Sequence, residues 1–130
     1  MTAATFSVRV YYEDTDFSGN VYHAAYLKFM ERARTEFLRA EGIHHSQLVK
    51  DGLAFAVRSM KIEFEGAAHI DDQLEVATEV LSVSAARLGL RQTIRRKEMV
   101  LVSAEVIVVA IKAGRAVRLP TVVLARFDHT

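Results

Sequence analysis

One stretch of the chain, residues 21–40, carries the only long helical pattern of apolar residues, and this constrains the fold more than any other feature. At about 100° per residue, one face of this stretch is apolar and the other is charged. Gly42 follows and can adopt the positive φ that ends many helices. We therefore expect a single long amphipathic helix, with one more helical turn at residues 46–50. The apolar face consists of Tyr22, Ala25, Tyr26, Phe29, Met30, Ala33 and Phe37.

Strand patterns fill most of the remaining chain. Residues 6–12 alternate between apolar and polar side chains ahead of the helix, and five further strands are expected at residues 53–65, 73–84, 87–97, 99–112 and 121–127. The sequence thus predicts an α+β fold in one domain, residues 1–130, with a five- to six-stranded antiparallel sheet wrapped around the helix. Because one helix cannot cover such a sheet completely, we also expect a homo-oligomer, either a dimer or a tetramer.

The segment between the first strand and the helix has the residues for acyl chemistry. Asp16 and Gly19 precede the helix, whose first backbone N–H groups have no partner in the helix itself. A carboxylate facing this positive end of the helix can attack a carbonyl carbon, or direct water onto it, while the N–H groups hold the oxygen. The candidate donors are the N–H groups of Val21, Tyr22 and His23.

Composition excludes several other kinds of function. The chain has no cysteine, which excludes disulfides and thiol catalysis. Its net charge of +1 gives no general attraction to nucleic acid or membranes. No apolar run reaches the length of a signal peptide core or a membrane span, which favours a cytoplasmic protein. The histidines lack the spacing of a metal site, so no metal or other cofactor is expected; they are His23, His44, His45, His69 and His129.

The residues from Tyr12 to Arg34 resemble the hotdog-fold acyl-CoA thioesterases. The likeness rests on Tyr12-Glu13-Asp14-Thr15-Asp16, Gly19, Val21-Tyr22-His23, Tyr26 and Glu31-Arg32-Ala33-Arg34, with weaker agreement at Val57-Arg58-Ser59-Met60 and Arg118-Leu119-Pro120. Within that group the chain looks like the Tol–Pal-associated branch, which is related to the 4-hydroxybenzoyl-CoA thioesterases.

The resemblance implies a function and a set of site residues. It implies hydrolysis of acyl-CoA thioesters, with short aliphatic or aromatic acyl groups, to a free acid and coenzyme A. Asp16 would be the nucleophile or general base, with His23 and Tyr12 beside it. Substrate would be bound by Gly19, Val21, Tyr22, Tyr26, Arg58 and Ser59.

Each assignment has a structural alternative. Asp16 could be a turn or N-cap residue, His23 a core histidine, and Tyr12 a packing aromatic. Asp14 is interpreted as structural, and Arg34 as half-buried, paired with Glu31 or with another subunit. For the coenzyme's phosphates the candidates are Arg58, Lys61, Arg87 and Arg91, although such side chains often only face solvent. Two other functions stay open: hydration of an enoyl thioester, and acyl-CoA binding without catalysis.

Overall fold

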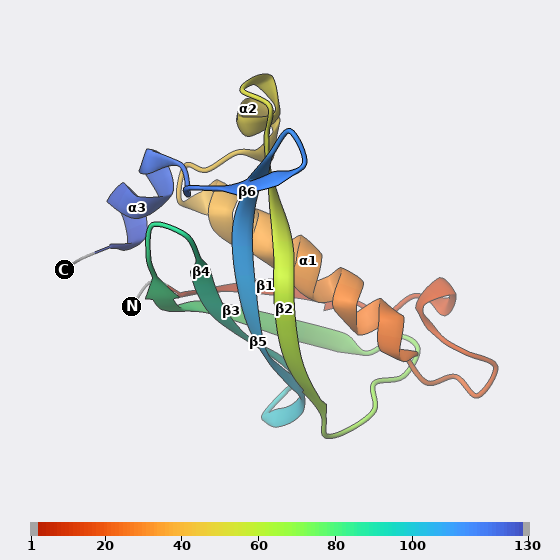
Figure 1. Ribbon diagram of the computed structural model, residues 1–130. Coiled ribbons are helices and arrows are strands. Elements are labelled where there is room, and N and C mark those ends of the chain that lie inside the picture. The colour runs from red at the N-terminus through yellow and green to blue at the C-terminus, as the bar shows by residue number, and fades with distance from the viewer. Residues whose placement is uncertain (1–2, 129–130) are drawn as a thin grey trace.

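The computed structural model describes residues 3–128 and contains one antiparallel sheet of six strands. The sheet has the order β1-β3-β4-β5-β2, and β6 pairs with the end of β5 (Figure 1). The strand bounds are β1 (Ala3–Arg9), β2 (Leu53–Phe64), β3 (Gln73–Val83), β4 (Leu88–Arg96), β5 (Met99–Lys112) and β6 (Arg115–Val117).

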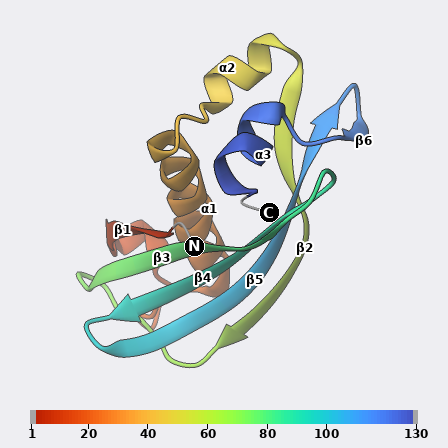
Figure 2. The same ribbon diagram turned by 90° about the vertical axis from the view of Figure 1, so that its left-hand side faces the viewer.

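The sheet curves around α1 (His23–Ala40), whose apolar face packs against its concave side (Figure 2). The buried residues of α1 are Ala25, Tyr26, Phe29, Met30, Ala33, Phe37 and Leu38. On the strands, side chains alternate between this core and the outer face, as in β3, where Leu74, Val76, Thr78 and Val80 are buried. The predicted α+β hotdog fold is confirmed, as is a second short helix, α2 (His45–Lys50). No helix within residues 3–128 is both long and apolar enough to span a membrane.

Strand β2 lies at one edge of the sheet, where among the described strands it pairs with β5 alone. Its pairing with β5 is interrupted by a bulge, because Val57 pairs with Val108 while Ser59 already pairs with Ile107. Arg58 is therefore the extra, unpaired residue. A bulge redirects the side chain at that point, and it bends the strand locally.

Three predicted elements differ from the structure. Residues 121–127 form helix α3 (Thr121–Phe127), not a strand. Pro120 is the N-cap residue of this helix, a place where its missing N–H removes no helical hydrogen bond. Phe127 stacks on Phe37, with ring centroids 5.6 Å apart.

The first strand ends at Arg9, and a 3-10 turn, η1 (Tyr12–Asp14), follows it. Helix α1 begins at His23, two residues later than expected, because Tyr22 is still extended with ψ of 158°.

Candidate active site

Asp16 begins a tight turn between η1 and α1. The turn is closed by hydrogen bonds from the Asp16 N–H to the Asn20 carbonyl (2.9 Å) and from the Gly19 N–H to the Asp16 carbonyl (3.1 Å). An antiparallel bridge between Thr15 and Val21 flanks it. Gly19 has a φ of 86°, a conformation that side chains other than glycine's disfavour. Gly19 therefore supplies backbone freedom to this turn, and its expected contact with substrate stays a prediction. We call residues 16–20 the Asp16 turn.

The Asp16 carboxylate is exposed and accepts hydrogen bonds from Ser18. Its Oδ1 lies 2.5 Å from the Ser18 hydroxyl and 2.8 Å from the Ser18 N–H. The bond from the hydroxyl, and then that from the N–H, lower the pKa of Asp16 below its usual value. The carboxylate is thus ionised at neutral pH, as both proposed chemical roles require. Asp14 has a different position: its Oδ2 accepts the Tyr11 N–H at 2.9 Å, which agrees with its structural interpretation.

Two of the three candidate oxyanion donors are already used. The Val21 N–H donates to the Ala68 carbonyl (2.9 Å), and the Tyr22 N–H donates to the Asp14 carbonyl (3.3 Å). These residues precede the helix, so their N–H groups serve the turn instead, and the expectation was wrong for Val21 and Tyr22 as oxyanion donors but not for His23. Within residues 3–128, no hydrogen bond uses the His23 N–H, which lies in the first turn of α1, where backbone donors lack partners in the helix.

The aromatic residues near the Asp16 turn fall into two groups. His23 is exposed, and its ring lies 4.5 Å from the ring of Phe64 at an angle of 58°, so it is not a core histidine. Tyr12 and Tyr22 are also exposed. Tyr26 is buried instead, and its hydroxyl oxygen accepts the Ala68 N–H at 2.8 Å, while burial raises its pKa. Tyr26 therefore supports the turn from the core through Ala68, and its expected contact with the acyl group stays a prediction.

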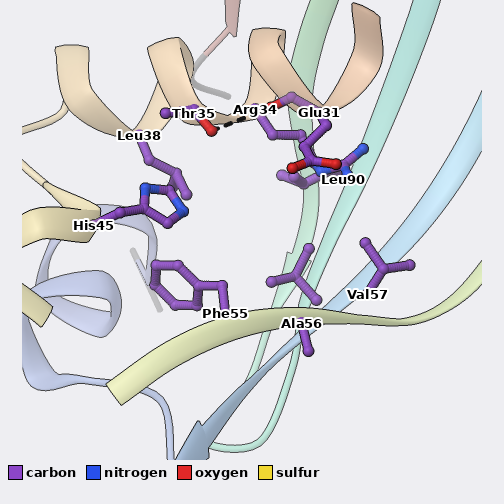
Figure 3. A pocket seen from close by; sticks show the side chains of 10 residues that line it. Glu31, Arg34, Thr35, Leu38, His45, Phe55, Ala56, Val57 and Leu90 are labelled. Carbon is purple, nitrogen blue, oxygen red and sulfur yellow. Dashed lines mark hydrogen bonds between the residues drawn. The ribbon is translucent and has the colours of Figure 1, made fainter. Parts of the chain in front are cut away.

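A cavity of about 260 Å³ lies between α1 and β2, further along the helix (Figure 3). Arg34 and Glu31 reach it from α1, and Phe55 and Val57 line it from β2; the other lining residues are Thr35, Leu38, His45, Ala56, Leu90 and Val108. Six of the ten lining residues are apolar. Glu31, Arg34 and Thr35 bring polar groups from α1, and His45 enters from α2 between Leu38 and Phe55.

Arg34 is held by a buried glutamine rather than by Glu31. Its Nη1 donates to Gln92 Oε1 at 2.9 Å, so the expected ion pair with Glu31 is replaced by a neutral partner. Burial lowers the pKa of Arg34, and the nearby Glu31 partly opposes this. The contact orients the guanidinium beside the cavity.

Gln92 is fully buried, and both the nitrogen and the oxygen of its side-chain amide form hydrogen bonds. Its Nε2 donates to the Met30 carbonyl (3.0 Å) and to the Thr78 hydroxyl (2.9 Å), which leaves its oxygen for Arg34. Sequence reasoning missed this residue. The signal was present, because Gln92 stands at an inward position of β4, where the alternate residues Leu88, Leu90 and Ile94 are apolar.

Three arginines from distant segments line a second cavity of about 410 Å³. Arg58 comes from the bulge of β2, Arg87 from the hairpin between β3 and β4, and Arg118 from the segment after β6. The last two segments are joined by the Leu119 N–H, which donates to the Ala85 carbonyl at 2.8 Å. The other lining residues, Ala85, Ala86, Val109, Ala116 and Val117, are uncharged, so this arginine cavity is strongly basic.

The other two phosphate candidates have acidic neighbours. Lys61 and Arg91 line a separate hollow together with Glu63 and Glu105, and Arg91 also pairs with Glu79 at 3.4 Å. Ser59 is exposed on β2, next to Arg58 but outside the lining of the arginine cavity. Of the four basic candidates, the structure thus brings together Arg58 and Arg87 and separates them from Lys61 and Arg91.

No group of three or more metal-ligand side chains occurs within residues 3–128. His129 lies outside the described residues.

Comparison with known proteins identifies the family. Residues 10–127 match the family model of the thioesterase-like superfamily. The chain belongs to this family. It is 44% identical over 128 residues to the acyl-CoA thioesterase YbgC of Haemophilus influenzae, covering 96% of this chain and 94% of that protein. It is 47% identical over 105 residues to the acyl-CoA thioester hydrolase YbgC of Escherichia coli, covering 80% and 78%.

A solved structure of a similar protein agrees with this family assignment. The crystal structure of a probable thioesterase from Bartonella henselae matches with a TM-score of 0.87 and 42% identity, covering 92% of this chain and all of that one. The predicted family and enzyme class, a thioesterase with the hotdog fold, are therefore confirmed.

Proposed function

We propose that this thioesterase hydrolyses acyl-CoA thioesters with short aliphatic or aromatic acyl groups, and that Asp16 is its catalytic carboxylate. The observation that carries the proposal is an ionised, accessible carboxylate on a glycine-containing turn directly before α1, in a chain of this family. The names of the YbgC relatives support acyl-CoA as the substrate class.

The geometry supports one reaction with two possible roles for Asp16. Asp16 either attacks the thioester carbonyl carbon or removes a proton from a water molecule that attacks it. The carbonyl oxygen gains negative charge, which the His23 N–H and the positive end of α1 can stabilise. The carbon–sulfur bond then breaks, the coenzyme leaves as a thiolate that takes up a proton, and the acyl group ends as a free acid after addition of water.

The size of the cavity between α1 and β2 favours a short acyl group. Its volume is about 260 Å³. Pockets that enclose a whole drug-sized ligand usually begin at roughly 300 Å³ and are often far larger. A short or aromatic acyl group therefore fits this space, whereas a complete acyl-CoA does not. Because the lining begins at Glu31, about 12 Å along α1 from His23, the Asp16 that reaches the carbonyl would belong to a second copy of the chain. Arg34 and Thr35 would face a polar substituent, and Phe55 and Leu38 would face its hydrocarbon part.

The arginine cavity suits the phosphates of coenzyme A. Guanidinium groups bind phosphate oxygens with charge-assisted, frequently paired hydrogen bonds. Two of the segments that line this cavity, β6 and the β3–β4 hairpin, lie near the C-terminal end of α1, however, whereas the Asp16 turn lies at the N-terminal end (Figure 1). We therefore propose that the substrate spans two copies of the chain in a homo-oligomer. The free edge of β2 offers a place for a second copy to pair, and two such dimers would make a tetramer.

Removing the three arginines of this cavity should weaken binding of the nucleotide part only. In Arg58→Ala/Arg87→Ala/Arg118→Ala, the KM for butyryl-CoA should rise about tenfold or more, since charged hydrogen bonds contribute about 1.5–3 kcal/mol each and about 1.4 kcal/mol is a factor of ten. The KM for the N-acetylcysteamine thioester, which lacks the phosphates, should stay unchanged. Lys61→Ala is the matched control, and equal effects on both substrates would refute this assignment.

Crotonyl-CoA distinguishes hydrolysis from hydration of an enoyl thioester. A thioesterase should release one free thiol for each thioester lost, measured with a thiol reagent. A hydratase should instead remove the enoyl absorbance without releasing thiol. A loss of enoyl absorbance without release of free thiol would therefore contradict hydrolysis and support hydration of the enoyl thioester.

A further inference from the structure

The loop between β2 and β3, residues 66–72, supports the Asp16 turn through its backbone. The Val21 N–H donates to the Ala68 carbonyl at 2.9 Å, and the Ile70 N–H donates to the Gly19 carbonyl at 3.2 Å. Asn20 and His69 also form an isolated antiparallel bridge. The turn is thus held on both sides of Asn20, and its position depends on the position of the 66–72 loop.

The same loop is held to the sheet by two arginines: Arg9 of β1, whose Nη1 donates to the Asp71 carbonyl at 2.8 Å, and Arg96, the last residue of β4. Of these two, only Arg96 bonds to both ends of the loop. Arg96 Nη1 donates to the Ala67 carbonyl at 3.1 Å and to Asp72 Oδ2 at 2.8 Å. That carboxylate oxygen also accepts the His69 N–H at 2.9 Å. Arg96 therefore contacts the loop near its beginning and, through Asp72, near its end, and both side chains are less than one-third exposed.

The ion pair is also electrostatically favourable. Burial alone would raise the pKa of Asp72, but the His69 N–H and the Arg96 guanidinium hold it below its usual value. The neighbouring titratable groups are Arg96 and His69, whose Nδ1 lies 3.7 Å from Asp72 Oδ2. Asp72 is thus ionised at neutral pH.

We propose that Arg96 and Asp72 are positioning residues for the Asp16 turn. This inference rests on the proposed role of Asp16. Neither residue shares a hydrogen bond with Asp16; they act through the 66–72 loop, which bonds to Gly19 and Val21. Because catalytic groups must be held to within about 0.5 Å of their productive geometry, a loosened loop should reduce the rate of the chemical step.

Arg96→Ala should lower kcat for butyryl-CoA by about 10²-fold, the effect of misplacing a catalytic group by about 1 Å. The KM should change less than twofold, since Arg96 lies outside the proposed acyl and phosphate cavities. Arg96→Lys keeps a cationic donor and should recover part of kcat. The matched control is Arg91→Ala, which removes another arginine–carboxylate pair from β4, the one with Glu79, away from the turn.

The outcomes separate this inference from the proposed function. If Arg96→Ala has the same kcat as the control Arg91→Ala, or if Arg96→Ala changes KM instead of kcat, the positioning role is wrong. Should Arg96→Ala fail to fold, Asp72→Asn tests the same contact with an isosteric side chain and should also lower kcat selectively; unchanged kcat there overturns the inference. Full activity of Asp16→Asn would refute the role of Asp16 itself, whatever the Arg96 variants do.

Discussion

Replacing Asp16 with Asn should lower kcat for butyryl-CoA by roughly 10²–10⁴-fold, the usual contribution of a general base or more. Asparagine keeps the size of the side chain and an oxygen that can accept the Ser18 N–H, so the turn should keep its shape. Because Asp16 is exposed, the urea midpoint of unfolding should stay close to that of the wild type. Thiol release measures the first effect and urea unfolding the second.

Glu13→Gln provides the matched control for the charge change. Glu13 is an exposed carboxylate on η1, three residues before Asp16, and its neutralisation should leave kcat unchanged. If both variants lose activity equally, the cause is the local charge rather than the Asp16 carboxylate. If neither loses activity, another group performs the chemistry.

Replacing Gln92 with Leu should destabilise the fold by about 2–4 kcal/mol, since buried polar groups lose their partner. Leucine fills a similar volume but leaves the Thr78 hydroxyl, the Met30 carbonyl and the half-buried Arg34 guanidinium without this partner. Each buried group left unsatisfied costs about 1–3 kcal/mol, partly offset by the gain in apolar burial. Urea unfolding monitored by circular dichroism should show the loss as a lower midpoint.

Gln73→Leu is the control for this substitution, because Gln73 is exposed at the start of β3. Its effect should stay within about 0.5 kcal/mol. Equal stability of the two variants would show that the buried network contributes little. A loss in Gln92→Leu alone would confirm that the network stabilises the contact between α1 and the sheet.

The periodic features of the fold were accessible from the sequence. The apolar face of residues 22–37 predicted α1, and alternation such as Leu74, Val76, Thr78 and Val80 predicted its sheet. These patterns repeat over many residues, so several residues within a single element support the same prediction. Residues 121–127 were misassigned because a short apolar run fits a strand or a buried helix equally well.

The site was less accessible, because its parts meet only after folding. Arg58, Arg87 and Arg118 lie on a bulge, a hairpin and a terminal segment, and no spacing in the sequence connects them. The Val21 and Tyr22 N–H groups could not be recognised as occupied, since their acceptors belong to Ala68 and Asp14. Asp16 was recognised by its resemblance to a known motif, and its catalytic role stays a prediction.

Thiol release from butyryl-CoA and benzoyl-CoA by the purified wild-type protein tests the central claim most directly. We expect one equivalent of coenzyme A thiol and one of free acid for each thioester consumed, with many turnovers per chain. Binding of these substrates without any release of thiol would contradict the account and would identify the protein as an acyl-CoA-binding member of the family.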